Sequence, residues 1–340
     1  MRFGLFGGAT AKTKDGPDVD TAQSYYDFIE YVIEAEALGY HSTFTAEHHF
    51  TGYGQISATL NLLTWLGAKT STIRLGTAVL VLPWHNPVLV AEQVATIDVL
   101  TGGRVDLGIG KGYRSVEFKS FCVPQEEAGA RFTEALDLMR KSWISKERFS
   151  YHGKYWHFDD IIVEPPVQQQ PHPPLWMAAG TEPSIREAAR NDCCLLVDQF
   201  CSLDTVGERL GWYRDEVQKL GRKFDPKTVG IARAFFVAHN EQEKETALDN
   251  RIAAQQKLVT VSGNSPSDRK ASILTFEDTR ESSEEAALIG RPDEIAAKIE
   301  KLKGMGVEYL LLNGGGSREN LRRFAREVIP SFAKQSVAAE

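Results

Sequence analysis

The chain has 340 residues, of which 42% are hydrophobic and 25% are charged, and this composition is typical of a globular protein. A formal net charge of −7 argues against nucleic acid and anionic membranes as partners, because both require a basic protein face. No apolar run approaches the roughly 20 residues that cross a bilayer, and the opening residues, MRFGLFGG, resemble a strand rather than a targeting leader. The four cysteines show no zinc-ligand spacing and are expected to be buried free thiols. A cytoplasmic protein is expected.

Strand and helix patterns alternate along the chain. Strand-like runs are expected at 2–7, 41–46, 73–82, 104–109, 175–179, 193–197, 229–238 and 308–312. Helical patterns are expected at 21–38, 56–69, 87–100, 126–143, 183–190, 203–220, 241–259, 293–305 and 317–332. Eight parallel strands joined by right-handed helical crossovers close into a barrel, so one (β/α)8 TIM-type barrel domain is predicted over residues 1–340. An open doubly wound sheet is the alternative, but no Gly-x-Gly-x-x-Gly turn follows the first strand.

Two segments interrupt the alternation and are expected to be insertions in the barrel. Residues 148–174 contain a hairpin-like tip at 151–156 and then a proline-rich stretch. Residues 262–288 begin with a long polar stretch without clear periodicity up to residue 285. Such a stretch is long enough to be a mobile lid or a disordered loop.

Polar, proton-active side chains follow the second predicted strand. Glu47, His48 and His49 come where this strand runs into a loop, and the C-terminal ends of barrel strands are where chemistry is housed. Because the two histidines are consecutive, only one of them can point into the barrel mouth. The functional interpretation is a proton-handling or cofactor-facing His48; the structural one is a histidine that hydrogen-bonds at a strand end. A metal site of His41, Glu47 and His48 is a weaker alternative, because His-x-His spacing is absent.

Glycine-rich segments follow three other predicted strands. At 109–114, glycines leave backbone amides open, and Lys111 and Arg114 supply positive charge for an anionic group. At 178–184, a glycine and two hydroxyls enter a helix N-terminus, which suits a phosphate, although Thr181 is equally explained as a plain N-cap. The Asn-Gly-Gly-Gly-Ser segment at 313–317 is a competing phosphate site, since many barrels bind phosphate after strands seven and eight.

The residues from 47 to 118 resemble those of bacterial luciferase. The shared motifs are EHHFTGYG at 47–54, LGTAV at 75–79, LP at 82–83, HNP at 85–87, AE at 91–92, GR at 103–104 and KG at 111–112. A weaker likeness extends through 179–181 and 289–294, so most of the chain is covered. The chain is therefore similar to the luciferase-like flavin-dependent monooxygenases, whose fold is an eight-stranded barrel with insertions.

The resemblance implies a two-component monooxygenase that uses FMN. Reduced FMN would sit at the C-terminal mouth over the third strand, where a cis peptide bond would fall at Ala78-Val79. The phosphate would be held by Lys111, Thr181 and Ser184 with backbone help. The candidate cofactor-binding residues are Ala78, Val79, Gly110, Lys111, Tyr113, Arg114, Ala179, Gly180, Thr181 and Ser184. His48 matches the family's catalytic histidine, which handles protons around the flavin–oxygen adduct, and a dry pocket would protect the flavin hydroperoxide.

The resemblance also implies partners and leaves alternatives open. A separate reductase would deliver reduced FMN, dioxygen and a small, apolar organic molecule would be the substrates, and a homodimer would form through the helices at 56–69 and 87–100. Gly110, Lys111 and Gly180 depart from luciferase, which has a cysteine, an arginine and an acidic residue there, and this argues against light emission from an aldehyde. The alternatives are hydride transfer with a deazaflavin, a flavin-binding protein without turnover, and a metal hydrolase on the same barrel.

Overall fold

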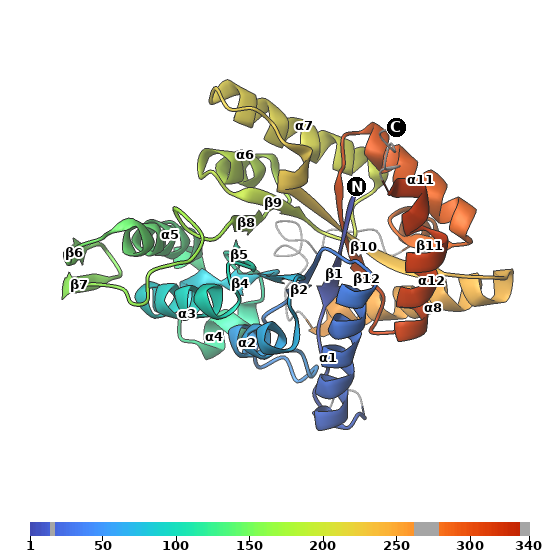
Figure 1. Ribbon diagram of the computed structural model, residues 1–340, viewed down its shortest axis with the longest axis horizontal. Coiled ribbons are helices and arrows are strands. Elements are labelled where there is room, and N and C mark those ends of the chain that lie inside the picture. Colours follow the sequence, from blue (N-terminus) through green and yellow to red (C-terminus); the bar gives the residue numbers. More distant parts are fainter. Residues whose placement is uncertain (14–17, 262–278, 334–340) are drawn as a thin grey trace, which may run out of the picture.

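The protein folds into a closed barrel of eight parallel strands, seen in a computed structural model that describes residues 1–13, 18–261 and 279–333 (Figure 1). The barrel strands are β1 (Arg2–Gly7), β2 (Ser42–Thr45), β3 (Arg74–Thr77), β5 (Val105–Gly110), β8 (Leu175–Ala178), β9 (Cys194–Val197), β10 (Val229–Val237) and β12 (Tyr309–Asn313). Each pairs in parallel with the next, and β12 pairs with β1 to close the circle. The predicted (β/α)8 barrel is confirmed.

Helices surround the barrel on its outside (Figure 1). They are α1 (Thr21–Ala37), α2 (Thr59–Lys69), α3 (Pro87–Leu100), α4 (Ser115–Ser120), α5 (Ala128–Ile144), α6 (Glu182–Arg190), α7 (Leu203–Lys219), α8 (Glu241–Val261), α10 (Arg280–Glu285), α11 (Pro292–Gly304) and α12 (Arg318–Glu327). The larger apolar core fills the space between strands and helices. A smaller one, including Phe44, Trp176 and Tyr309, fills the barrel interior. No helix in the described parts of the chain is long and apolar enough to cross a membrane.

The run at 73–82, predicted as one continuous strand, is divided in the structure. The strand β3 ends at Thr77, the Ala78-Val79 peptide bond is cis as the resemblance implied, and β4 (Leu80–Val81) leads into a 3₁₀ turn at Leu82–Trp84. The backbone N–H of Val81 donates to Glu47 Oε2 at 2.7 Å instead of to a neighbouring strand. This long-range bond explains why an apolar run alone predicts the segment wrongly.

The two expected insertions differ in outcome. The strands β6 (Phe149–His152) and β7 (His157–Ile161) form the predicted hairpin. Much of the polar stretch, residues 262–278, lies outside the described residues. The remainder was expected to be irregular. This expectation is wrong for residues 280–285, which form α10, because the side chain of Thr279 caps the helix. The short strand β11 (Leu288–Gly290), also not predicted, extends the sheet beside β10.

The four cysteines are free thiols, as expected, but they are not all buried. Cys193 and Cys201 are buried, Cys194 is intermediate and Cys122 is exposed. Cys122 follows the short helix α4, where the backbone turns with a φ of 55° before the next element begins. The expected burial is therefore wrong for Cys122.

Candidate functional site

The C-terminal ends of the barrel strands open into a cavity of about 1010 Å³. Its lining comes from β1, β2, β5, β8, β9, β10 and β12 and the residues that follow some of them, from the cis peptide after β3, and from Lys257 and Leu258 of α8. Ten of the eleven predicted site residues line it: His48, Ala78, Val79, Gly110, Lys111, Tyr113, Ala179, Gly180, Thr181 and Ser184. Residues expected from four separate motifs are thus brought to one place.

His48 lines this cavity, and its imidazole is hydrogen-bonded to a buried carboxylate. Its Nδ1 lies 3.1 Å from Oε1 of Glu117, a residue of α4 that is 1% exposed. Burial lowers the pKa of His48 below the usual 6.5, although the hydrogen bond to Glu117 opposes the shift. The ring is therefore mainly neutral at pH 7. With Nδ1–H donating to the carboxylate, Nε2 carries the lone pair and can accept a proton.

A second buried carboxylate, Glu47, organises the loop that carries His48. Its Oε1 accepts hydrogen bonds from Nε2 of His49 at 3.0 Å and of His85 at 2.7 Å, and its Oε2 accepts from the Val81 amide. Burial alone would raise the pKa of Glu47, but these hydrogen bonds outweigh burial and lower it. His49 is thereby held in a structural network, and His48 is the histidine of the pair that lines the cavity.

The structure does not assemble the metal site that was a weaker alternative. His41 and Glu47 lie at opposite ends of β2, and the ring of His41 packs against Tyr309 with centroids 5.6 Å apart. Burial lowers the pKa of His41 to about 4. Within residues 1–13, 18–261 and 279–333, no group of three or more His, Cys, Asp or Glu side chains is arranged to hold a metal ion.

The N-terminus of α6 forms a polar end of the cavity. Thr181 and Ser184 make a capping box, with their hydroxyl oxygens 2.9 Å apart and Ser184 Oγ donating to the Thr181 carbonyl. Lys111 approaches from β5, and its Nζ lies 2.7 Å from Oε2 of Glu187 on α6. The N-cap interpretation and the anion-site interpretation are compatible, since an N-capped helix still presents positive partial charge at this end.

Arg209 is a site residue that the sequence does not reveal. It projects from α7, pairs with Asp198 and lines the same cavity. Its Nη2 lies 3.4 Å from the position that a Cβ on Gly180 would take, and its Nε is buried without a hydrogen-bond partner. A second cation therefore faces the α6 end. An arginine in the middle of a helical pattern gives no signal of this, because its location depends on how α7 packs against the barrel.

Arg114, in contrast, does not line the cavity although the sequence suggested it. Its side chain is fully buried; Nη1 donates to Gln55 Oε1 at 2.7 Å and Nε donates to the Tyr113 hydroxyl at 3.3 Å. Both partners line the cavity, so Arg114 supports the wall. Of the competing segment at 313–317, Asn313 reaches the cavity, whereas the hydroxyl of Ser317 caps α12 by accepting from Asn320.

The cavity suits a ligand with a flat apolar part and an anionic tail. Ala78 and Val79 form an apolar surface, and Gly110 lets it lie close to β5, since a Cβ on Gly110 would stand 2.5 Å from Val79 Cγ2. The α6 end supplies hydroxyls, backbone amides and the cations Lys111 and Arg209. Phosphate groups bind well at such helix N-termini. A flavin mononucleotide, with its ring system and single phosphate, therefore fits these residues.

The comparisons with known proteins agree with this chemistry. A family model described as luciferase-like monooxygenase matches residues 1–309. The chain is 26% identical to the oxygenase component of the flavin-dependent trigonelline monooxygenase of Acinetobacter baylyi, over 99% of this chain and 97% of that protein. It is also 26% identical to an F420-dependent glucose-6-phosphate dehydrogenase of Amycolatopsis mediterranei, over 90% of this chain and 94% of that one.

Solved structures share the fold over nearly the whole length. The monooxygenase RslO1 from Streptomyces bottropensis superposes with a TM-score of 0.84 at 24% identity, covering 98% of this chain and 100% of that chain. The oxygenating constituent of 3,6-diketocamphane monooxygenase from Pseudomonas putida, solved in complex with FMN, gives a TM-score of 0.80 at 18% identity, with 97% and 98% covered. On the match of the family model, the chain belongs to the luciferase-like monooxygenase family.

Proposed function

We propose that this chain is the oxygenase component of a two-component, FMN-dependent monooxygenase. A separate reductase supplies reduced FMN, and the chain uses it with dioxygen to oxidise a small organic substrate. The observation that carries the proposal is the cavity at the barrel mouth, which combines an apolar surface, an anion-binding end and a neutral His48 backed by Glu117. The similarity to the oxygenase component from Acinetobacter baylyi supports it.

The polar end of the cavity binds the phosphate in this proposal. Lys111 and Arg209 supply charge, Thr181 and Ser184 supply hydroxyls, and the α6 N-terminus supplies partial positive charge. The ring system lies against Ala78 and Val79. When bound, reduced FMN provides the electrons that activate dioxygen.

His48 handles the proton at the other end of the cavity. Because Glu117 holds Nδ1–H, Nε2 is the atom that takes a proton from a donor in the cavity and returns it. A neutral imidazole suits this role near pH 7, since a protonated ring cannot accept. The apolar lining contributed by Val79, Val81 and Ile56 limits the access of water to the reacting atoms.

Hydride transfer with a deazaflavin is the second candidate function. The F420-dependent relative from Amycolatopsis mediterranei favours it, because its match extends over 90% of this chain. A deazaflavin also presents a flat ring and a phosphate, so the same residues would hold it. A protein that binds flavin without turnover is a further alternative from the sequence.

The test is an anaerobic titration with reduced FMN, followed by mixing with oxygenated buffer in a stopped-flow spectrometer. We expect saturable binding and then a transient absorbance that differs from those of reduced and oxidised FMN. Binding of reduced F420 with no binding of FMN would replace the proposal by hydride transfer. Flavin binding with no acceleration or delay of its reoxidation would indicate a protein without turnover.

We also propose a homodimer formed through α2 and α3. Both helices carry large apolar side chains at the surface; Trp65 and Leu89 are each 51% exposed. A contiguous exposed apolar patch is typical of a protein interface.

A further inference from the structure

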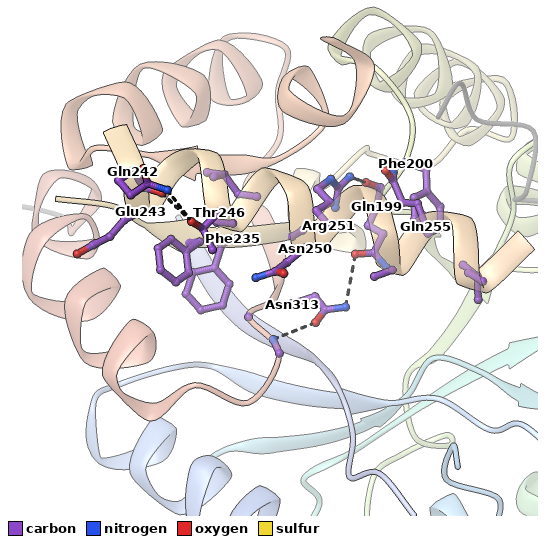
Figure 2. A pocket seen from close by; sticks show the side chains of 18 of the residues that line it. Gln199, Phe200, Phe235, Gln242, Glu243, Thr246, Asn250, Arg251, Gln255 and Asn313 are labelled. Atoms are coloured by element: carbon purple, nitrogen blue, oxygen red, sulfur yellow. Dashed lines mark hydrogen bonds between the residues drawn. The ribbon is translucent and has the colours of Figure 1, made fainter. Parts of the chain in front are cut away.

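A second cavity has a volume of about 610 Å³, and Figure 2 shows the side chains that line it. It is located between α8 and the C-terminal ends of β10 and β12. Five residues line both cavities: Tyr53, Gln199, Phe200, Leu258 and Asn313. The two spaces therefore share a wall, and a molecule in the second cavity lies next to the proposed flavin site.

The second cavity has one apolar side and one side rich in amides. The apolar side comes from Ala234, Phe235 and Phe236 of β10 and from Ile289 of β11. Amide side chains, among them Asn250 and Gln255 of α8 with Gln199 and Asn313 facing the helix, form the other (Figure 2). Asn313 Nδ2 donates to Gln199 Oε1 at a long 3.4 Å, so neither amide is strongly engaged by the other.

Arg251 lines this cavity, and no salt bridge from it to a carboxylate is found within residues 1–13, 18–261 and 279–333. Its Nε donates to the Ser283 carbonyl at 3.1 Å and its Nη2 to the Gln199 carbonyl at 3.0 Å, while the side chain is 8% exposed. Among the described residues, no carboxylate lies within ion-pair distance of it. Burial, and then repulsion from the buried Arg233, lower the pKa of Arg251 to about 10.

Neither Arg233, which repels this guanidinium, nor Glu243, which lines the same cavity, neutralises it. Arg233 donates to carbonyl oxygens, including that of Cys201, and likewise has no ion pair within the described part of the chain. Glu243 also lines the cavity, but its Oε2 lies 2.8 Å from Nη1 of Arg323 and accepts from the His239 amide. A buried charge without a counterion is costly. An anionic ligand would supply the missing charge.

The glycine turn after β12 lines the same cavity as Arg251. Gly314 has no room for a side chain, since a Cβ there would stand 2.4 Å from Cε1 of Phe235. Gly315 adopts a φ of +63°, and its amide donates to Asn313 Oδ1 at 3.4 Å. This turn is the segment whose sequence suggested a competing anion site, and it lies at the second cavity rather than at the α6 end of the first.

We propose that the second cavity binds the substrate and that the substrate is an organic carboxylate. Its carboxylate contacts Arg251 and the nearby amides, and its hydrophobic body lies against Ala234 and Phe236 and extends past Phe200 toward the first cavity. The proposal rests on the proposed function, because it takes the first cavity as the cofactor site. It replaces the small apolar substrate expected from the sequence with an amphiphilic acid.

The test uses benzoate and its neutral analogue benzamide as probes. Each is titrated by calorimetry into the wild-type protein saturated with oxidised FMN. We expect benzoate to bind at least about tenfold more tightly than benzamide, and we expect Arg251→Gln to abolish the preference while Arg251→Lys keeps part of it. The matched control is Arg280→Gln, which removes an equal charge from an arginine that pairs with Glu245 and Asp249 on the outside of α8.

A second variant keeps the proposal testable if Arg251→Gln does not fold. Asn250 is exposed on α8 and lines the cavity, so Asn250→Glu adds a carboxylate without disturbing the core. It is expected to weaken benzoate about tenfold and to leave benzamide unchanged. Equal binding of the two probes, no binding of benzoate, or an unaltered preference in both variants overturns the proposal.

FMN affinity, measured on the same samples by quenching of flavin fluorescence, separates this proposal from the proposed function. Loss of FMN binding in Arg251→Gln assigns the arginine to the cofactor and overturns the substrate site. Absence of FMN binding in the wild type counts against the proposed function instead. In that case the preference for benzoate, measured without FMN, still tests the second cavity.

Discussion

The two neighbouring histidines of the loop after β2 have different surroundings, and only His48 meets the cavity. We expect His48→Ala to leave FMN affinity within a few-fold, because a neutral ring contributes little charge to binding, while the transient after oxygen mixing becomes shorter. His48 would hold or move a proton at Nε2 beside the bound cofactor, and without it less of the oxygen consumed would be coupled to substrate oxidation. Stopped-flow absorbance and a peroxide assay measure both effects. His152→Ala, on the exposed hairpin, is the control, and an unchanged transient in His48→Ala would remove His48 from the mechanism.

The pH dependence tests the pairing of His48 with Glu117. Protonation of Nε2 removes the acceptor, so activity is expected to fall as pH drops through the pKa of His48, which lies below 6.5. Glu117 raises this pKa by accepting the hydrogen bond from Nδ1. In Glu117→Gln, the fall in activity on the acidic side of the pH profile should therefore occur at lower pH. The measurement is the rate of the oxygen-dependent step across the acidic range, and a limb displaced to higher pH would contradict the assignment.

The anion-binding end can be tested one cation at a time. Lys111→Ala and Arg209→Ala should each weaken FMN by about 1.5–3 kcal/mol, the scale of a charge-assisted hydrogen bond. Ser317→Ala is the control: it removes the cap of α12 and should cost about 1 kcal/mol of stability without changing FMN affinity. Fluorescence titration and urea unfolding measure the two quantities. If Ser317→Ala has the largest effect on FMN, the phosphate lies after β12 instead.

At the scale of elements, Glu47 joins three segments that are apart in sequence: the loop after β2, the strand β4 and the residues that precede α3. Glu47→Gln should destabilise the protein by about 2–3 kcal/mol at neutral pH, because hydrogen bonds to a buried charge are lost. The folded pKa of Glu47 is lowered, so its contribution is present above the usual 4.5 and disappears as pH falls below it. Urea unfolding of the wild type and of Glu47→Gln at several pH values measures this contribution. A difference between their unfolding free energies that grows toward acidic pH would contradict the prediction.

Most barrel strands were predictable because they are short apolar runs that the helices and the barrel interior bury on two sides, and β2, with the sequence STFT, was predictable from its alternation. What the sequence did not predict depends on contacts between distant residues. The division of 73–82 depends on the bond from the Val81 amide to Glu47, and α4 and β11 are too short to show a period. At the site, the residues at the ends of strands were predicted from the sequence. Glu117, Arg209 and Arg251 were not, because their helices reach the cavities only through tertiary packing.

At the scale of the whole molecule, the cavities open at one end of the barrel, whereas α2 and α3 lie on its side (Figure 1). The proposed dimer interface is therefore separate from the α6 end that would hold the phosphate. Substitutions on these helices can be used to change assembly without removing a group from either cavity. This separation allows the oligomeric state and FMN binding to be measured as independent quantities.

Trp65→Glu combined with Leu89→Glu is expected to convert a dimer into monomers. Each change places a carboxylate on a side chain that is half exposed in the monomer, so folding is little affected, but burying the charges between two copies costs several kcal/mol. Sedimentation equilibrium measures the mass. Glu92→Gln, a conservative change at a half-buried position of α3, serves as the control for helix stability. A monomeric wild type, or a double variant that remains dimeric, would show that α2 and α3 do not form the interface. FMN affinity should survive dissociation within a few-fold, because each barrel carries its own set of phosphate-binding residues.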